Sequence, residues 1–156
     1  MTDESYLVSP DPPIGDLRFP IDVRIPSDVR YIERIVRVVA QQCALYALPP
    51  RICRLNVRVA LTEALSNAIL YGNREDRRKP VRLRGTIDER ALVFEIVDEG
   101  GGFDLDECTT DPTLEENLVR EDGRGLFLMR QLMDRVERFQ RGGGVENVVR
   151  LTLHRV

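Results

Sequence analysis

Hydrophobic and polar positions follow two different periods along the chain, and these periods predict the order of the elements. Residues 17–25 (LRFPIDVRI) alternate apolar and polar side chains, which predicts a strand. Pro20 lies inside this segment and favours an edge position, because proline cannot donate to a neighbouring strand. After a helix start signal at Ser27 or Asp28, apolar residues recur at helical spacing from Ile32 to Cys43.

A second helix is predicted over residues 50–71, between Pro50 and the Gly72-Asn73 pair that ends it. Its apolar residues cover more than one stripe, so most of its circumference should be buried. The remaining predicted elements are strands at 81–88 and 91–98, a helix at 125–136, and strands at 138–140 and 147–153 around three glycines. Short hairpins mixed with helices predict an α+β two-layer sandwich, with helices covering one face of a mostly antiparallel sheet.

Composition limits the classes of protein that this pattern fits. The chain has 156 residues, 42% of them hydrophobic, which suits one domain. We assign residues 1–16, which are rich in proline, to an extended tail and residues 17–156 to the domain. The net charge of −3 disfavours direct nucleic-acid binding, and no apolar run is long enough for a membrane span. Three cysteines in no metal-ligand spacing, together with the absence of a signal-like N-terminus, predict a cytoplasmic protein.

The single histidine, His154, excludes several kinds of catalytic site. A Ser-His-Asp triad, a zinc site built on several histidines or a histidine phosphoacceptor at any other position would need a histidine that the chain does not have. Candidate chemistry therefore has to come from carboxylates, amides, glycines and arginines.

Three polar side chains interrupt the apolar second helix at equal spacing. Glu63, Asn67 and Tyr71 stand at i, i+4 and i+8, so an α-helix would place them on one face. They form either a solvent-facing stripe or a group that points into a pocket. In a pocket, Asn67 can give its side-chain oxygen to a magnesium ion, and Glu63 can accept a proton from an attacking hydroxyl.

Two glycine-rich segments follow. DEGGGF at 98–103 comes directly after a strand, and its glycines allow the backbone to approach a ligand while Asp98 accepts a hydrogen bond from an exocyclic amine. GRGLF at 123–127 opens the last helix, whose N-terminus attracts phosphate, and Arg124 can add a charged contact. A flexible turn and a glycine-softened helix entry would give the same two patterns, and no Walker motif is present.

The order of the three segments is more specific than any one of them. ALTEALSNAILYGN, DEGGGF and GRGLF resemble the N-box and the two glycine boxes of the GHKL (Bergerat-fold) ATP-binding superfamily. DPTLEENL and GRGLFLMRQLMD further resemble the bacterial anti-sigma-factor serine/threonine kinases. The resemblance extends over residues 17–156 and implies a Bergerat sandwich with ATP between the helices and the glycine boxes.

The resemblance also implies a role for residues in each motif. Glu63 would be the general base, Asn67 would hold magnesium, and Asp98 would bind adenine beside the hinge glycines Gly100 and Gly102.

The second glycine box would face the phosphates through Gly123, Arg124 and Gly125, and residues 104–122 would form the lid over ATP. The nucleotide-binding residues expected from the matching segments also include Tyr71, Phe103, Leu126 and Asn147.

Two positions depart from the family pattern. Tyr71 stands where many relatives have histidine, a change that should be tolerated beside the metal. On the last strand, relatives often carry a Gly-Thr pair whose threonine helps to hold adenine, whereas this chain has Glu146-Asn147. Asn147 keeps hydrogen-bonding groups at that position.

Partners are expected from the resemblance alone. It implies phosphorylation of a serine on a STAS-type anti-anti-sigma protein, sequestration of a sigma factor, and a homodimer. Such a kinase needs a base, a metal and a phosphate cradle, because the partner supplies the nucleophile. The alternatives are a nucleotide-gated binding module that switches partners without phosphorylating them, and a scaffold that binds no nucleotide.

Overall fold

Five strands form one sheet in the order β1-β2-β3-β5-β4, and each described pairing is antiparallel. The computed structural model describes residues 17–100 and 121–155. The strands are β1 (Ile21–Ile25), β2 (Val81–Ile87), β3 (Ala91–Asp98), β4 (Arg135–Arg141) and β5 (Glu146–His154). Because β1 is an edge strand and begins directly after Pro20, the predicted edge position is confirmed.

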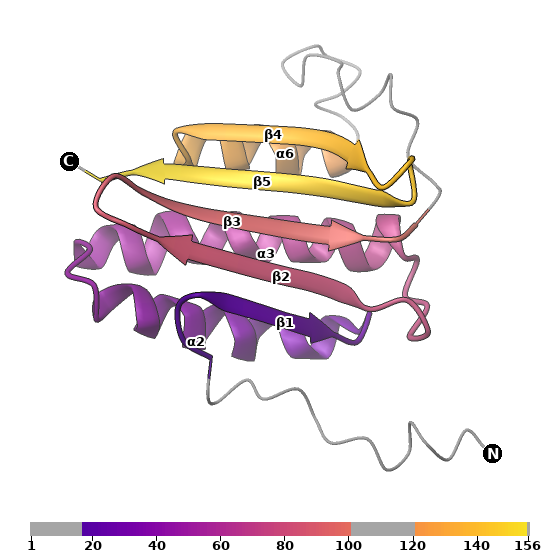
Figure 1. Ribbon diagram of the computed structural model, residues 1–156, viewed down its shortest axis with the longest axis horizontal. Helices are drawn as coiled ribbons and strands as arrows, with labels where there is room; N and C mark the ends of the chain where they lie inside the picture. Colours follow the sequence, from indigo (N-terminus) through magenta and orange to yellow (C-terminus); the bar gives the residue numbers. More distant parts are fainter. Residues whose placement is uncertain (1–16, 101–120, 156) are drawn as a thin grey trace.

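The helices lie together on one face of this sheet (Figure 1). They are the 3₁₀ turn η2 (Val29–Tyr31), α2 (Ile32–Ala44), the π-helix η3 (Ile52–Val57), α3 (Arg58–Asn67), the π-helix η4 (Ala68–Gly72) and α6 (Glu121–Leu132). The predicted α+β two-layer sandwich is therefore confirmed, and the element order agrees with the sequence pattern.

Several predicted boundaries were wrong, and each error has a physical reason. The last helix ends at Leu132 rather than at residue 136, because Val136 pairs with Leu151 in the sheet. The same helix begins at Glu121, before Gly125. The strand β4 therefore starts at Arg135 and is longer than the predicted 138–140. Helical periodicity in a short apolar stretch does not distinguish a final helical turn from the first residues of a buried strand.

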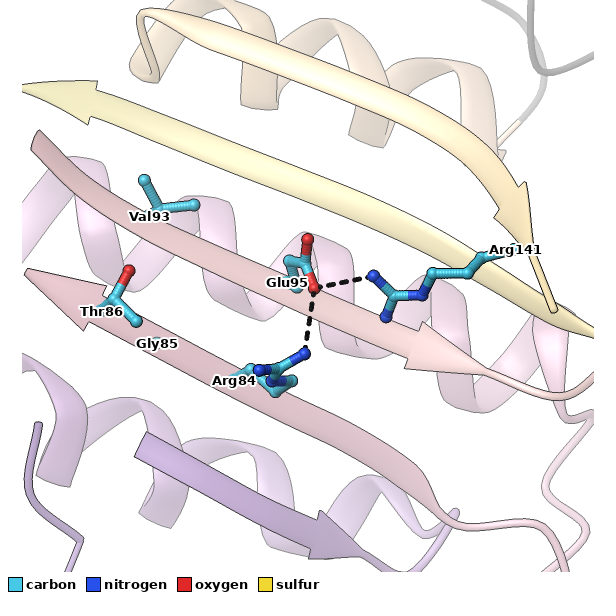
Figure 2. Close-up of a pocket in the computed structure, with 6 residues that line it drawn as sticks. All are labelled: Arg84, Gly85, Thr86, Val93, Glu95 and Arg141. Carbon is cyan, nitrogen blue, oxygen red and sulfur yellow. Dashed lines mark hydrogen bonds and ion pairs between the residues drawn. The ribbon is translucent and has the colours of Figure 1, made fainter. Parts of the chain in front are cut away.

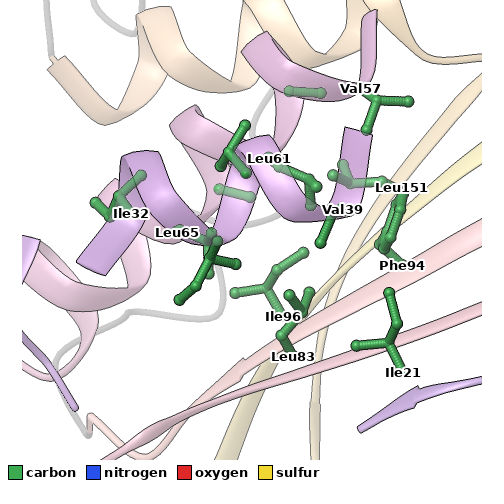
Figure 3. Packing of buried hydrophobic residues seen from close by; sticks show 14 of the residues in the cluster. Ile21, Ile32, Val39, Val57, Leu61, Leu65, Leu83, Phe94, Ile96 and Leu151 are labelled. Carbon is green, nitrogen blue, oxygen red and sulfur yellow. The ribbon is translucent and has the colours of Figure 1, made fainter. Parts of the chain in front are cut away.

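The core lies between the sheet and α2 and α3 (Figure 3). Leu83, Phe94 and Ile96 point from the central strands toward Leu61 and Leu65 of α3. All five side chains are at most 1% exposed. Because burying each such side chain contributes about 1.5–3 kcal/mol, this layer holds α3 firmly on the sheet.

Two of the three cysteines belong to this core as free thiols. Cys43 on α2 and Cys53 on η3 are both buried, and burial raises the pKa of the Cys43 thiol to about 12. Neither thiol is therefore a reactive nucleophile. Cys108 lies outside the described residues.

Across residues 17–100 and 121–155, no helix combines the length and apolar character that a membrane crossing requires.

Candidate functional site

The first and third motifs meet where α3 packs against α6. A Cβ atom built on Gly125 would lie 2.8 Å from Oε1 of Glu63 and 3.1 Å from Nδ2 of Asn67. The absence of a side chain at Gly125 therefore leaves room for both polar groups beside α6, one turn after its first residue. Of the two alternatives for Glu63 and Asn67, this approach to α6 favours the group that points into a site over the solvent-facing stripe.

Asp98 closes the other end of the site, at the end of β3. It is only 4% exposed, and its Oδ1 atom accepts hydrogen bonds from the Gly100 N–H at 3.0 Å and from Nδ2 of Asn147 at 2.9 Å. Within the described part of the chain, Oδ2 of Asp98 receives no hydrogen bond. A buried carboxylate oxygen without a donor is unfavourable, so this atom is suited to accept an N–H from a ligand.

The charge on Asp98 has opposing influences. Burial raises the pKa of Asp98, while the hydrogen bonds from Asn147 and Gly100 lower it, and the net direction is upward. A ligand that donated a hydrogen bond to Oδ2 would favour the ionised form and offset part of the cost of burial.

The first and second motifs touch through glycines. A Cβ on Gly72 would collide with the carboxylate of Asp98, and a Cβ on Gly100 would collide with the carbonyl of Gly72. This backbone approach requires glycine at both positions. The end of η4 and the turn after β3 therefore form one continuous wall.

The helix that carries the first motif is not a regular α-helix. After Asn67 it continues as the π-helix η4, in which the N–H of Asn73 bonds to the carbonyl of Ala68 at 2.8 Å. A π-helical turn contains more residues than an α-helical turn, so Tyr71 departs from the i, i+4, i+8 line that the sequence predicted. Its side chain is 37% exposed.

Asn147 reaches the site from β5, directly opposite Asp98 in the sheet register. Its amide nitrogen donates to Asp98 and to the carbonyl of Gly100, and its oxygen accepts from Nε2 of Gln140 at 3.0 Å. Asn147 thus orients the carboxylate of Asp98. This contact differs from the direct adenine role that relatives assign to the threonine at this position.

Asn73 is a buried polar residue that the sequence pattern did not single out as part of the site. It is 3% exposed, and its side-chain oxygen accepts the N–H of Glu99 at 2.9 Å. The sequence pattern uses Asn73 only to end the second helix and as the last residue of the ALTEALSNAILYGN segment. The only signal for a further role was a polar residue directly after the glycine that ends this segment.

The remaining predicted site residues lie in the hydrophobic core, in the first turn of α6 or outside the described part of the structure. Leu126 is 3% exposed and its side chain belongs to the hydrophobic core. Gly123 lies in the first turn of α6, and the side chain of Arg124 is outside the described part of the structure. Gly102, Phe103 and almost all of the predicted lid at 104–122 also lie outside the described residues.

A hollow of about 210 Å³ lies elsewhere, on the sheet face that the helices leave uncovered (Figure 2). Glu95 on its floor pairs with Arg141 at 3.2 Å, Arg150 at 2.8 Å and Arg84 at 3.9 Å. Asp98 and Glu95 point to opposite faces of β3, because side chains alternate along a strand. The hollow is therefore separate from the site formed by Glu63, Asn67 and Asp98.

Comparisons with known proteins show the family to which the chain is similar. The family model described as the histidine kinase-like ATPase domain matches residues 25–153. Serine-protein kinase RsbW of Bacillus subtilis (strain 168) is 35% identical over 95 residues, which cover 58% of this chain and 59% of that protein. Anti-sigma F factor of Clostridium beijerinckii is 35% identical over 109 residues, 66% of this chain and 74% of that protein.

Two further similarities complete the comparison. RsbW of Bacillus velezensis is 28% identical over 122 residues, which cover 75% of this chain and 76% of that protein. Among solved structures, the mycobacterial sensor histidine kinase MprB aligns with a TM-score of 0.47 at 18% identity, covering 64% of this chain and 70% of that chain.

Proposed function

The chain belongs to the histidine kinase-like ATPase domain family, and within it to the anti-sigma factors and their RsbW-like kinases. On that premise we propose that it is an ATP-dependent serine-protein kinase that phosphorylates a STAS-type anti-anti-sigma protein and sequesters a sigma factor. The observation that carries the proposal is the buried Oδ2 atom of Asp98, which receives no hydrogen bond from residues 17–100 and 121–155 and lies beside the touching glycines Gly72 and Gly100.

At the adenine end, the chemistry of Asp98 fits an amino-purine. Its Oδ2 atom would accept a hydrogen bond from the exocyclic amine, while Oδ1 stays bound to Gly100 and Asn147. The contact between Gly72 and Gly100 leaves no side chain between the carboxylate and a flat ring. The residues present therefore fit a bound adenine.

At the phosphate end, Glu63 and Asn67 stand beside Gly125, one turn after the start of α6. The N-terminal region of this 12-residue helix provides backbone N–H groups and the positive end of the helix dipole for phosphate. Asn67 would contribute a side-chain oxygen to magnesium, which when bound neutralises charge on the phosphates. Oxygens of the bound nucleotide's phosphates would supply further ligands to the ion.

Glu63 would serve as the general base for transfer. It would accept the proton of the partner's serine hydroxyl as that oxygen bonds to the γ-phosphorus. The bond from the γ-phosphorus to the β,γ-bridging oxygen would break, and ADP would leave. The chain needs no nucleophile of its own for this reaction, since the partner supplies the serine.

The location, oligomeric state and partners that we propose are inferred from the similarity to the relatives. We infer a cytoplasmic protein that acts as a homodimer and controls transcription through protein partners rather than through nucleic acid. The relative named as a serine-protein kinase supports the kinase activity, and the relative named as an anti-sigma factor supports binding of a sigma factor.

Replacing Glu63 by glutamine tests the kinase role. With radiolabelled ATP, magnesium and a STAS protein from the same organism, we expect Glu63→Gln to bind ATP normally and to lose phosphoryl transfer by roughly 10²–10⁴-fold. Glu89→Gln, in the exposed turn between β2 and β3, is the matched control and should keep full activity. Unchanged transfer in Glu63→Gln would contradict the role of Glu63. If the unmodified protein binds ATP and changes its affinity for partners without any transfer, the nucleotide-gated switch replaces the kinase.

A further inference from the structure

One buried side chain, that of Asn73, connects the turn after Asp98 with two other segments of the chain. The side-chain oxygen of Asn73 accepts the Glu99 N–H at 2.9 Å. Its amide nitrogen lies within hydrogen-bonding distance of the Ser27 hydroxyl at 3.0 Å and of the carbonyls of Lys79 at 2.7 Å and Pro80 at 3.2 Å. Both ends of this amide therefore have hydrogen-bond partners, and two of these, Ser27 and Glu99, are distant in sequence.

The π-helix η4 delivers Asn73 to this position. Its i→i+5 hydrogen bond from Asn73 to Ala68 widens the final turn, and the Glu75 N–H bonds to the carbonyl of Ile69 at 2.7 Å. Arg74 and Glu75 then adopt positive φ values of 52° and 59°, which turn the backbone away from the helix. The side chain of Asn73 lies between the residues that precede β2, Lys79 and Pro80, and Glu99, which follows β3.

The hydrogen bond to Glu99 acts on the residues that hold adenine in the proposed function. The Glu99 N–H belongs to the peptide unit that joins Asp98 to Glu99, and the next N–H, that of Gly100, bonds to Oδ1 of Asp98. Asn147 fixes the same carboxylate from β5. Asn73 therefore holds the backbone of this turn, while Gly100 and Asn147 hold the carboxylate.

We propose that Asn73 is a positioning residue that sets the selectivity of the site for adenine, by holding the 98–100 turn so that Oδ2 of Asp98 faces the exocyclic amine. This inference rests on the proposed ATP-binding function. Asn73 does not touch the ligand in this scheme. It acts through the placement of one acceptor atom, Oδ2 of Asp98. If this carboxylate is displaced, it no longer distinguishes the exocyclic amine of adenine from the carbonyl oxygen at the same position of hypoxanthine.

Comparing ATP with ITP tests this role directly. ITP carries a carbonyl oxygen in place of the exocyclic amine, so it cannot donate to Asp98 and places an acceptor against it. Calorimetric titration of the full chain with each nucleotide and magnesium gives the ratio of the two dissociation constants. We expect the unmodified protein to prefer ATP and Asn73→Ala to reduce that preference about tenfold or more, because a hydrogen bond to a charged group is lost or weakened.

Two further variants separate positioning from general loss of stability. Ser27→Ala removes a partner from the far end of the same amide but leaves the Glu99 contact intact, so it should lower the melting temperature and keep the ATP preference within about twofold. Asn73→Asp would keep an oxygen for the Glu99 N–H but would set its second oxygen against the carbonyls of Lys79 and Pro80. Asn73→Ser instead replaces Asn73→Ala if that variant does not fold, because its hydroxyl can donate to one of these carbonyls and is too short to hold the Glu99 N–H, and it should lose the ATP preference in the same way.

The outcomes distinguish this inference from the function on which it rests. If the unmodified protein prefers ATP and Asn73→Ala keeps that preference while folded, the positioning role is wrong and the proposed function stands. If the unmodified protein binds neither nucleotide, or binds both equally, the assignment of Asp98 to adenine fails and the role of Asn73 fails with it.

Discussion

Asp98 combines burial with a charge that the protein only partly stabilises. Its pKa is raised by burial, against hydrogen bonds from Asn147 and Gly100 that favour the ionised form. Such a residue weakens the empty protein, and a ligand that supplies a donor recovers the loss. Perturbed carboxylates of this kind are found where proteins bind ligands or perform chemistry, although buried structural carboxylates show the same shift.

The raised pKa of Asp98 predicts a specific dependence of stability on pH. Between the unfolded value of 3.8 and the higher folded pKa, the folded state retains a proton that the unfolded state has released. The free energy of unfolding of the unmodified protein, relative to that of Asp98→Asn, should therefore fall as the pH rises through this window. Urea unfolding of both proteins from acidic to neutral pH measures the difference.

Asp88 provides a control with the opposite sign. The N–H groups of Ala91 and Arg90 lower the pKa of Asp88, so its contribution to stability is present above 3.8 and is lost as the pH falls through the folded value. The unmodified protein should therefore gain stability relative to Asp88→Asn as the pH rises. A parallel trend for Asp98 and Asp88 would contradict the assignment.

Gly125 makes a second prediction for a single residue. A methyl group there would press on the flexible end of Glu63, 2.8 Å away, and on Asn67. Because Glu63 can move aside, we expect Gly125→Ala to fold with a loss of no more than about 1 kcal/mol. Phosphoryl transfer should fall by about tenfold or more, because the base is displaced from its position. Melting curves and transfer assays on the same preparation show whether activity and stability separate as expected.

At the scale of elements, the site depends on the contact between the end of η4 and the turn after β3. A methyl group on Gly100 would collide with the backbone carbonyl of Gly72, which cannot move without displacing η4. We expect Gly100→Ala to lose about 1–3 kcal/mol of stability and its ATP binding together. Thermal melts and ATP titrations of this variant measure both losses.

Gly143 is the matched control for the loss at Gly100. It lies in the β4–β5 turn with a φ of 70°, and a Cβ there would meet no atom within 4 Å. Gly143→Ala should therefore cost about 1–2 kcal/mol of backbone strain and leave ATP binding unchanged. If Gly100→Ala bound ATP as tightly as Gly143→Ala, the close contact between the two motifs would have no functional role.

The elements were predictable to different degrees. The hairpin of β2 and β3 follows from two short strand-like segments that flank Glu89-Arg90, and the edge position of β1 follows from Pro20, because both signals are local. The π-helices η3 and η4 were not predictable, since apolar residues surround this helix and hide a change in the number of residues per turn. Tyr71 was placed in line with Asn67 for that reason.

For the site, sequence reasoning identified residues but not their contacts. Glu63, Asn67 and Asp98 were found because their motifs occur in a recognisable order. The contacts of Asn147 with Asp98 and of Asn73 with Glu99 join residues 49 and 26 positions apart, so only the fold brings them together. A position that breaks the family pattern, such as Asn147, gains its role from the strand register rather than from its motif.

At the scale of the whole molecule, the two faces of the sheet differ in the side chains that they carry. The inner face carries the apolar core and ends at Asp98 and Asn147, where β3 and β5 pair. The outer face carries arginines paired with Glu95 and its neighbours. The buried apolar side chains of the inner layer hold the helices on the sheet, and the site lies at the end of that layer.

Binding of ATP beside Asp98 is the property on which every other proposed role depends. Calorimetric titration of nucleotide-stripped protein with ATP and magnesium, in parallel with Asp98→Asn, tests it most directly. We predict saturable binding of one ATP per chain that Asp98→Asn loses. Failure of the unmodified protein to bind ATP, or equal binding by Asp98→Asn, would contradict the claim.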